Sequence, residues 1–213
     1  MLTFYYADGA CSMASHIVLE ETGAPYEPHR IALDRQENFS PAYRAINPRG
    51  KVPALVVDGD VLTENVAILT YLARAFPQAR LLPDDLIGTC HCLETAAWLS
   101  NAVHPHWTRF RRTERFADDP VAHETVRQVG LRSFWNALKE IDERLARKTW
   151  MMGEHYTICD PYALVFLGWA KRGGLPVAEL ENYSGFARRM MQRPAVAAII
   201  KREGNVLLES AAA

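Results

Sequence analysis

The sequence predicts an α/β domain with the element order β-α-β then β-β-α, followed by an all-helical domain. Short runs of strand-favouring residues alternate with amphipathic segments in the first third of the chain. A break that contains Pro77 and Pro83 then interrupts this alternation, and beyond it no convincing strand pattern follows. We therefore predict a first domain over residues 1–77, a linker over 78–85 and a helical domain over 86–213.

The first strand and the first helix are separated by a tight turn. The apolar run Leu2 to Tyr6 predicts the strand, and Gly9 breaks this run. The periodic segment Ser12 to Thr22, closed by Gly23, predicts the helix. This order places Cys11 just before the first helical turn.

The rest of the first domain is expected to hold three more strands and a helix. A strand is predicted over Tyr26 to Ile31, and the polar stretch Asp34 to Ile46 is expected to be irregular or weakly helical. The sequence Asp58-Gly59-Asp60 between two short apolar runs is typical of a hairpin. The two hairpin strands and the amphipathic helix after them cover Ala54 to Val57, Val61 to Thr63 and Glu64 to Phe76.

Capping signals and apolar spacing define the helical domain. A helix over Ile87 to Val103 is expected to end or kink at Pro105, because proline lacks the backbone donor that continues a helix. Asp119 before Pro120 predicts an N-cap. The helix after it carries apolar residues at spacings of three and four: Leu131, Phe134, Leu138, Ile141 and Leu145.

The end of the chain is expected to be helical as well. Thr157 to Asp160 has the form of a capping box, with Asp in place of Glu, and it leads into the apolar segment Pro161 to Trp169. Further helices are predicted over Arg188 to Arg193 and Ala195 to Arg202, and the terminal residues Ala211 to Ala213 are expected to fray.

Composition and charge argue against several classes of partner. The chain has 213 residues, of which 49% are hydrophobic, and its formal net charge is −1. Such a charge offers no general attraction to nucleic acid or anionic lipid. The longest apolar runs are too short to span a bilayer, and the chain opens without the pattern of a secretory signal. We expect neither a nucleic-acid nor a membrane partner.

The cysteine pattern predicts neither a metal site nor a disulfide framework. Cys11, Cys90, Cys92 and Cys159 have the spacing of neither zinc ligands nor a disulfide-rich domain. Free thiols are the default in a reducing compartment, so a cytoplasmic protein without a bound metal is expected.

Cys11 is the first candidate for the chemistry. At the start of a helix, unpaired backbone N–H groups and the positive end of the helix dipole point toward its sulfur. Such surroundings lower the pKa of a thiol and favour the thiolate, which is its reactive form. The alternative is that Cys11 packs a loop as an inert thiol.

Three further residues are candidates for ligand contacts. A cis bond between Val52 and Pro53 would turn the backbone of Val52 outward, toward an extended peptide, whereas an ordinary trans proline is the alternative. Glu64 opens a helix and could bind a ligand ammonium or simply complement the helix dipole. His104, at a predicted helix end, could donate to a thiolate or a carboxylate, or could be a favourable charge there.

Three motifs in order resemble the cytosolic glutathione S-transferases, most closely the beta class of bacteria. They are Tyr5 to His16, Asn47 to Leu55, and Leu62 to Leu72. In the second part, Trp98-Leu99, Val103-His104 and Gly153 to Ala163 are similar to the helical domain of the class. The resemblance covers nearly the whole chain. It implies a thioredoxin-like first domain, an all-helical second domain and a homodimer.

The resemblance also implies where glutathione binds. Cys11 would face the sulfur of glutathione. Either the thiol of Cys11 or the hydroxyl of Ser12 would form a hydrogen bond to the glutathione sulfur, and His104 would lie nearby. The backbone of Val52, beside a cis Pro53, would pair with the cysteinyl part. Glu64 would hold the γ-glutamyl ammonium. The other implied contacts are Asn65, which replaces the usual serine at the γ-glutamyl carboxylate, Arg35 near the glycyl carboxylate, Lys51 and Asn101.

Three functions remain open from the sequence. The first is transfer of glutathione to a small hydrophobic electrophile bound beside the helical domain. The second is reduction of a disulfide or a peroxide through Cys11, by a monothiol route because Ala14 occupies the place of a second cysteine. The third is a binding module of the same shape that performs no chemistry.

Overall fold

A four-stranded mixed sheet forms the first part of this computed structural model, which describes residues 1–207. The strands are β1 (Leu2–Tyr6), β2 (Tyr26–Arg30), β3 (Ala54–Val57) and β4 (Asp60–Thr63), in the spatial order β2-β1-β3-β4. β1 is parallel to β2 and antiparallel to β3, which pairs with β4 as the predicted hairpin. The expectation for Ala211 to Ala213 lies outside the described residues.

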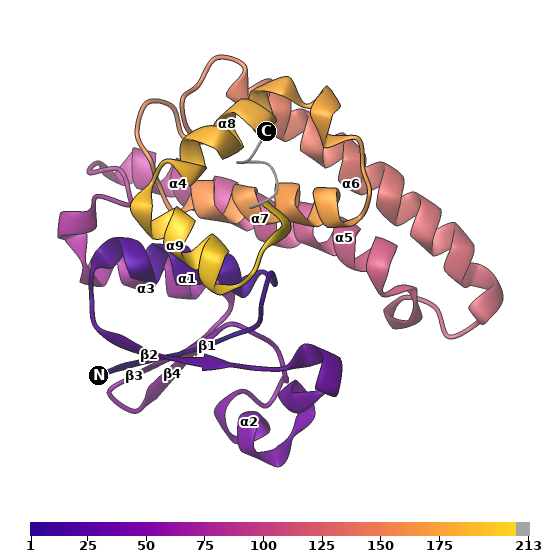
Figure 1. The fold of residues 1–213 in the computed structure, drawn as a ribbon, viewed down its shortest axis with the longest axis horizontal. Helices are drawn as coiled ribbons and strands as arrows, with labels where there is room; N and C mark the ends of the chain where they lie inside the picture. The colour runs from indigo at the N-terminus through magenta and orange to yellow at the C-terminus, as the bar shows by residue number, and fades with distance from the viewer. Residues whose placement is uncertain (208–213) are drawn as a thin grey trace.

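Two helices lie between this sheet and the rest of the molecule. They are α1 (Ser12–Thr22) and α3 (Asn65–Ala75), while the short α2 (Pro41–Ile46) lies at the other end of the sheet (Figure 1). α1 ends where the predicted Gly23 adopts a left-handed conformation with φ 68°. Because α1 packs on α3, α7 and α9, most of its side chains are buried. The order β-α-β then β-β-α is confirmed, with α2 inside the stretch expected to be weakly helical.

Up to residue 207, the second part contains six α-helices and one π-helical segment, joined by loops and short 3-10 turns. They are α4 (Leu86–Trp98), the π segment Leu99–Val103, α5 (His104–Arg111), α6 (His123–Leu145), α7 (Cys159–Arg172), α8 (Glu181–Met191) and α9 (Pro194–Arg202). α5 and α6 form a long antiparallel pair that extends away from the sheet (Figure 1). The predicted all-helical architecture is confirmed, and α8 begins earlier than the sequence suggested.

Of the two outcomes expected at Pro105, an end of the helix is wrong, because the chain stays helical and only its regular hydrogen-bond pattern is interrupted. Backbone hydrogen bonds shift to the wider π pattern over Leu99–Val103, and Pro105 falls in the first turn of α5. A proline is tolerated there because its missing N–H lies where the regular pattern is already interrupted. The chain therefore continues as a helix, and His104 opens a new helical segment.

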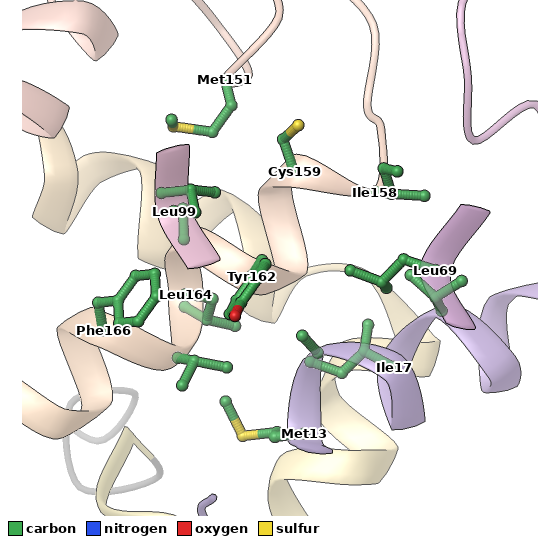
Figure 2. Packing of buried hydrophobic residues seen from close by; sticks show 14 of the residues in the cluster. Met13, Ile17, Leu69, Leu99, Met151, Ile158, Cys159, Tyr162, Leu164 and Phe166 are labelled. Atoms are coloured by element: carbon green, nitrogen blue, oxygen red, sulfur yellow. The ribbon is translucent and has the colours of Figure 1, made fainter. Parts of the chain in front are cut away.

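One hydrophobic core joins the two parts, with α7 at its centre. Met13 and Ile17 of α1 lie close to Tyr162 of α7, and Leu69 of α3 completes this contact (Figure 2). The predicted capping box is confirmed, because Asp160 accepts hydrogen bonds from the backbone N–H groups of Thr157 and Met151, both at 2.7 Å. The core fixes the first domain against the helices, and the candidate site lies where the two meet.

Candidate functional site

Cys11 lies between β1 and α1, at the start of the helix. Its side chain is half-buried, and its thiol donates a hydrogen bond to the carbonyl oxygen of Val52 at 3.4 Å. The Val52–Pro53 peptide bond is cis. Two of the predicted motifs, 41 positions apart in the chain, therefore meet at one sulfur atom.

The protonation state of Cys11 differs from the sequence prediction. Burial raises the pKa of its thiol to about 12, although the backbone N–H groups of Cys11 and Ser12 oppose this rise. Glu64 raises the pKa further, and Lys51 lowers it. The helix N-terminus acts on the sulfur as expected, but desolvation is the larger effect. The expected thiolate is therefore wrong: near neutral pH Cys11 is a thiol, and it donates a hydrogen bond.

The hydroxyl of Ser12 is hydrogen-bonded within the protein, and its predicted contact with the sulfur of a ligand stays a prediction. Ser12 is fully buried, and its Oγ donates to the carbonyl of Ala7 and accepts from the N–H of the same residue. Both bonds join the end of β1 to the first turn of α1. Ser12 therefore acts on the Cys11 thiol through its backbone N–H and not through its hydroxyl.

The third motif supports the loop around Cys11. The buried side chain of Asn65 donates to the carbonyl of Cys11 at 2.9 Å and accepts from the hydroxyl of Ser15 at 2.6 Å. The amide expected to reach a ligand carboxylate is thus committed to the protein. The first turn of α3 still carries backbone N–H groups that no helical carbonyl can accept.

Glu64, just before this turn, is exposed and has a positive φ of 69°. A residue with a side chain is strained there by about 1–3 kcal/mol, and such strain is common at ligand-binding positions. Glu64 therefore presents its carboxylate to solvent at the entrance of α3.

His104 and Lys51 border the same space. The ring of His104 packs against Trp169, with ring centroids 4.9 Å apart, and burial together with Lys51 lowers the pKa of His104 to about 4. His104 is therefore neutral near pH 7 and lies at the start of a helix. The alternative of a charged histidine at a helix C-terminus is wrong. Lys51 acts electrostatically on both Cys11 and His104, which places the three side chains around one region.

Two predicted contact residues lie on the surface without a described link to this region. Arg35 is exposed at the end of a short 3-10 turn, Leu33–Arg35. Asn101 is exposed on the π segment between α4 and α5. Their proposed roles at the ligand remain predictions.

Sequence reasoning missed the residues that hold the loop before Cys11. The N–H of Gly9 donates to a carboxylate oxygen of Glu203 at 2.8 Å, and the indole N–H of Trp169 donates to the carbonyl of Gly9 at 2.9 Å. The other oxygen of Glu203 lies 2.8 Å from Nδ1 of His16, and both side chains are fully buried. No local pattern connects Gly9 with a residue 194 positions later.

The assembled site suits a peptide-like ligand that carries a thiol and carboxylates. Cys11 and neutral His104 offer donors to a sulfur atom, Lys51 offers a positive charge, and the backbone of Val52 offers an extended edge. Over residues 1–207, no three His, Cys, Asp or Glu side chains are grouped so as to hold a metal ion. Every helix in that range is too short or too polar to span a bilayer.

Comparison with known proteins gives relatives along the whole chain. A family model described as the glutathione S-transferase N-terminal domain matches residues 2–74. Glutathione S-transferase GstA of Escherichia coli O157:H7 is 34% identical over 207 residues, which is 95% of this chain and 99% of that protein.

Two solved structures have the same fold. A glutathione transferase homologue from Sulfitobacter with bound glutathione has a TM-score of 0.89 and 30% identity, covering 95% of this chain and 98% of that one. A bacterial beta class glutathione S-transferase from Sphingomonas chungbukensis has a TM-score of 0.84 and 30% identity, with the same coverage of 95% and 98%.

Proposed function

This chain belongs to the glutathione S-transferase family, and we propose that it conjugates glutathione to small electrophiles at the site around Cys11. The observation that carries the proposal is the protonated Cys11 thiol, placed at the N-terminus of α1 and 3.4 Å from the Val52 carbonyl. A neutral thiol in this position can donate a hydrogen bond to the thiolate of a bound glutathione.

We assign each part of glutathione to a group of matching chemistry. Its extended cysteinyl part would pair with the backbone of Val52, beside Pro53. The γ-glutamyl ammonium would meet the exposed carboxylate of Glu64, and the γ-glutamyl carboxylate would meet the free N–H groups of the first turn of α3, at Asn65. Arg35, Lys51 and Asn101 would contact the remaining polar groups.

The site would act by stabilising the thiolate of glutathione. The thiol loses its proton to solvent, and the resulting charge is met by the Cys11 thiol, by the backbone N–H groups at the start of α1 and by the field of Lys51. Neutral His104 can donate one more N–H to the same sulfur. The thiolate then attacks an electrophilic carbon, so that a carbon–sulfur bond forms and the leaving group departs with its electron pair.

Reduction of a disulfide or peroxide through Cys11 is less well supported. That route needs Cys11 itself as a thiolate nucleophile. A pKa of about 12 leaves almost none of this form near neutral pH. Ala14 in the place of a second cysteine also removes the dithiol version of the reaction.

Paired rate measurements test the proposal. We expect the protein to bind immobilised glutathione and to conjugate an activated aromatic halide faster than it reduces a mixed disulfide of glutathione. Faster reduction of the mixed disulfide would favour the reductase. Binding of glutathione with no turnover of either substrate would favour the binding module.

We further infer a homodimer in the cytoplasm. Leu86 and Ile87, at the start of α4, are 80% and 66% exposed, and such side chains are commonly covered by a partner. The four free cysteines fit a reducing compartment. Light scattering should give twice the chain mass for the wild type and a lower mass for the double variant Leu86→Asp, Ile87→Asp. Val121→Asp, at an 85% exposed position before α6, is the control. A wild-type monomer would refute the inference.

A further inference from the structure

Two rows of side chains face each other beside the candidate site, one from α5 and one from α7. Residues three or four positions apart share a face of a helix. The α5 row is His104, Trp107 and Arg111, and the α7 row is Phe166, Trp169 and Arg172. The ring of His104 packs on Trp169, and the rings of Trp107 and Trp169 are stacked with centroids 5.5 Å apart. The rows form an aromatic wall that begins at His104 and ends in two arginines.

The arginines close the far end of this wall. The guanidinium carbon of Arg111 lies 5.8 Å from the centre of the Trp107 ring. Arg172 lies against the loop before Cys11, because a Cβ placed on Gly9 would stand only 2.0 Å from its Nη2 atom. Both arginines are exposed. The pKa of Arg172 is lowered, first by its partial burial and second by the nearby charge of Arg111, while the charge of Glu203 opposes this change.

Neither arginine has an acidic partner in the part of the chain that the structure describes. The ion pairs within residues 1–207 leave out Arg111 and Arg172. The nearby carboxylates have other partners: Asp8 binds Arg30, and Glu203 binds His16 and the N–H of Gly9. Exposed arginines are ordinarily solvated, but two beside one aromatic wall repel each other, and a bound anion would relieve that repulsion.

We propose that Arg111 and Arg172 bind a carboxylate on the electrophile, whose unsaturated body lies along Trp107 toward His104 and Cys11. The inference rests on the proposed function and narrows its substrate class from small hydrophobic electrophiles to electrophiles that carry an anionic group. With an aryl chloride, the carbon–sulfur bond forms and the carbon–chlorine bond breaks. Chloride leaves with the electron pair, and the thiol proton goes to solvent.

A matched pair of substrates tests this proposal. We would measure kcat/KM for a chlorodinitrobenzoate and for its neutral carboxamide, and take the ratio of the two, corrected for their uncatalysed rates. The ratio cancels general effects on folding or on the catalytic loop. For the wild type we expect the ratio to exceed one and to fall as salt is added, since exposed charges are screened. Arg111→Gln and Arg172→Gln should each lower the ratio about fivefold, the size of one exposed charge pair.

Arg109→Gln is the matched control. Arg109 is on the same helix with the same charge, but its guanidinium lies over Phe116 and contacts His106. This variant should keep the wild-type ratio. A ratio near one in the wild type, or equal loss of both activities in the Arg111 and Arg172 variants, would overturn the inference and leave the proposed function intact. Absence of conjugation with either substrate would overturn both.

Discussion

Two physical effects oppose each other at the Cys11 thiol. Backbone N–H groups at the start of α1 favour the thiolate, whereas burial disfavours any charge on the sulfur. Burial wins, and the thiol instead donates to the Val52 carbonyl. Rotation about the Cβ–Sγ bond would turn the S–H from the Val52 carbonyl toward a ligand sulfur, so Cys11 is a poor nucleophile but can stabilise the thiolate of a ligand.

Cys11→Ala should therefore impair the chemistry more than the binding of glutathione. Loss of one hydrogen bond to a charged group costs about 1.5–3 kcal/mol, so we expect kcat to fall roughly tenfold or more. KM for glutathione should change by less than about threefold, because the contacts proposed for Val52, Glu64 and Asn65 remain. Steady-state kinetics with Cys90→Ala, an exposed cysteine, as control provide the test. A large rise in KM with unchanged kcat would contradict it.

His104 should make the stability of the protein sensitive to acid. Its pKa is about 4 when folded, and about 6.5 in an unfolded chain. Between these values the unfolded chain binds more protons, so the stabilisation from neutral His104 is complete above pH 6.5 and is lost as the pH falls toward 4.

This predicted loss of stability at low pH can be checked with urea unfolding at several pH values. We expect the free energy of unfolding of the wild type, minus that of His104→Gln, to shrink as the pH falls through that window. A constant difference for His104→Gln would show that the buried imidazole does not titrate as expected.

At the scale of elements, α7 shows why a helix buried on most sides needs a cap made of side chains. Its residues from Cys159 to Ala170 are all buried, so water cannot satisfy the N–H groups near its first turn. The hydroxyl of Thr157 accepts from the N–H of Cys159 instead, and Asp160 accepts from the N–H groups of Thr157 and Met151 in the chain that enters the helix. The capping box thereby also fixes the chain that enters the helix.

Asp160→Ala should be among the more destabilising single changes in the chain. It leaves two buried N–H groups without an acceptor, which should lower the free energy of unfolding by about 2–4 kcal/mol. Asp119→Ala is the matched control, since Asp119 caps the short turn Pro120–Ala122 at the surface, and its removal should cost about 0.5 kcal/mol. Chemical denaturation gives the free energy of unfolding of both variants. Equal losses in the two variants would contradict the expected difference between a buried and an exposed cap.

At the scale of the whole molecule, the last helix holds the first loop. Glu203, just after α9, accepts from the N–H of Gly9 and lies beside His16, while Trp169 of α7 holds the carbonyl of Gly9. The loop that carries Cys11 is therefore positioned by the helical part as much as by its own strand and helix. Removal of the hydrogen bond between Gly9 and Glu203 should therefore lower both the stability and the activity.

Glu203→Ala should lower both the free energy of unfolding and kcat. Removing the buried carboxylate leaves the N–H of Gly9 and the ring of His16 without their partner, which should cost about 2–3 kcal/mol, and Glu203→Gln should cost less because an oxygen remains for Gly9. Glu140→Ala removes an exposed pair with Arg144 on α6 and should cost no more than about 0.5 kcal/mol. Unfolding and rate measurements on the three variants test this, and a normal kcat in Glu203→Ala would show that the loop keeps its position alone.

Local signals account for most of the fold and for part of the site. Strand-favouring runs, the hairpin at Asp58-Gly59-Asp60 and the apolar spacing of α6 predicted the architecture because each depends on a few neighbouring residues. The π segment before Pro105 was not predictable from such spacing, because continuation past a proline depends on packing against α7.

The sequence alone determined the family, the order of the elements and the two motifs that meet at Cys11 and Val52, since these follow from patterns whose members lie close together in the chain. Only the tertiary structure decided the charge on Cys11 and His104, the inward direction of the Ser12 hydroxyl and the link from Glu203 to Gly9. Each of these depends on burial or on a contact between distant segments, and both arise only when the sheet and the helices pack into one core.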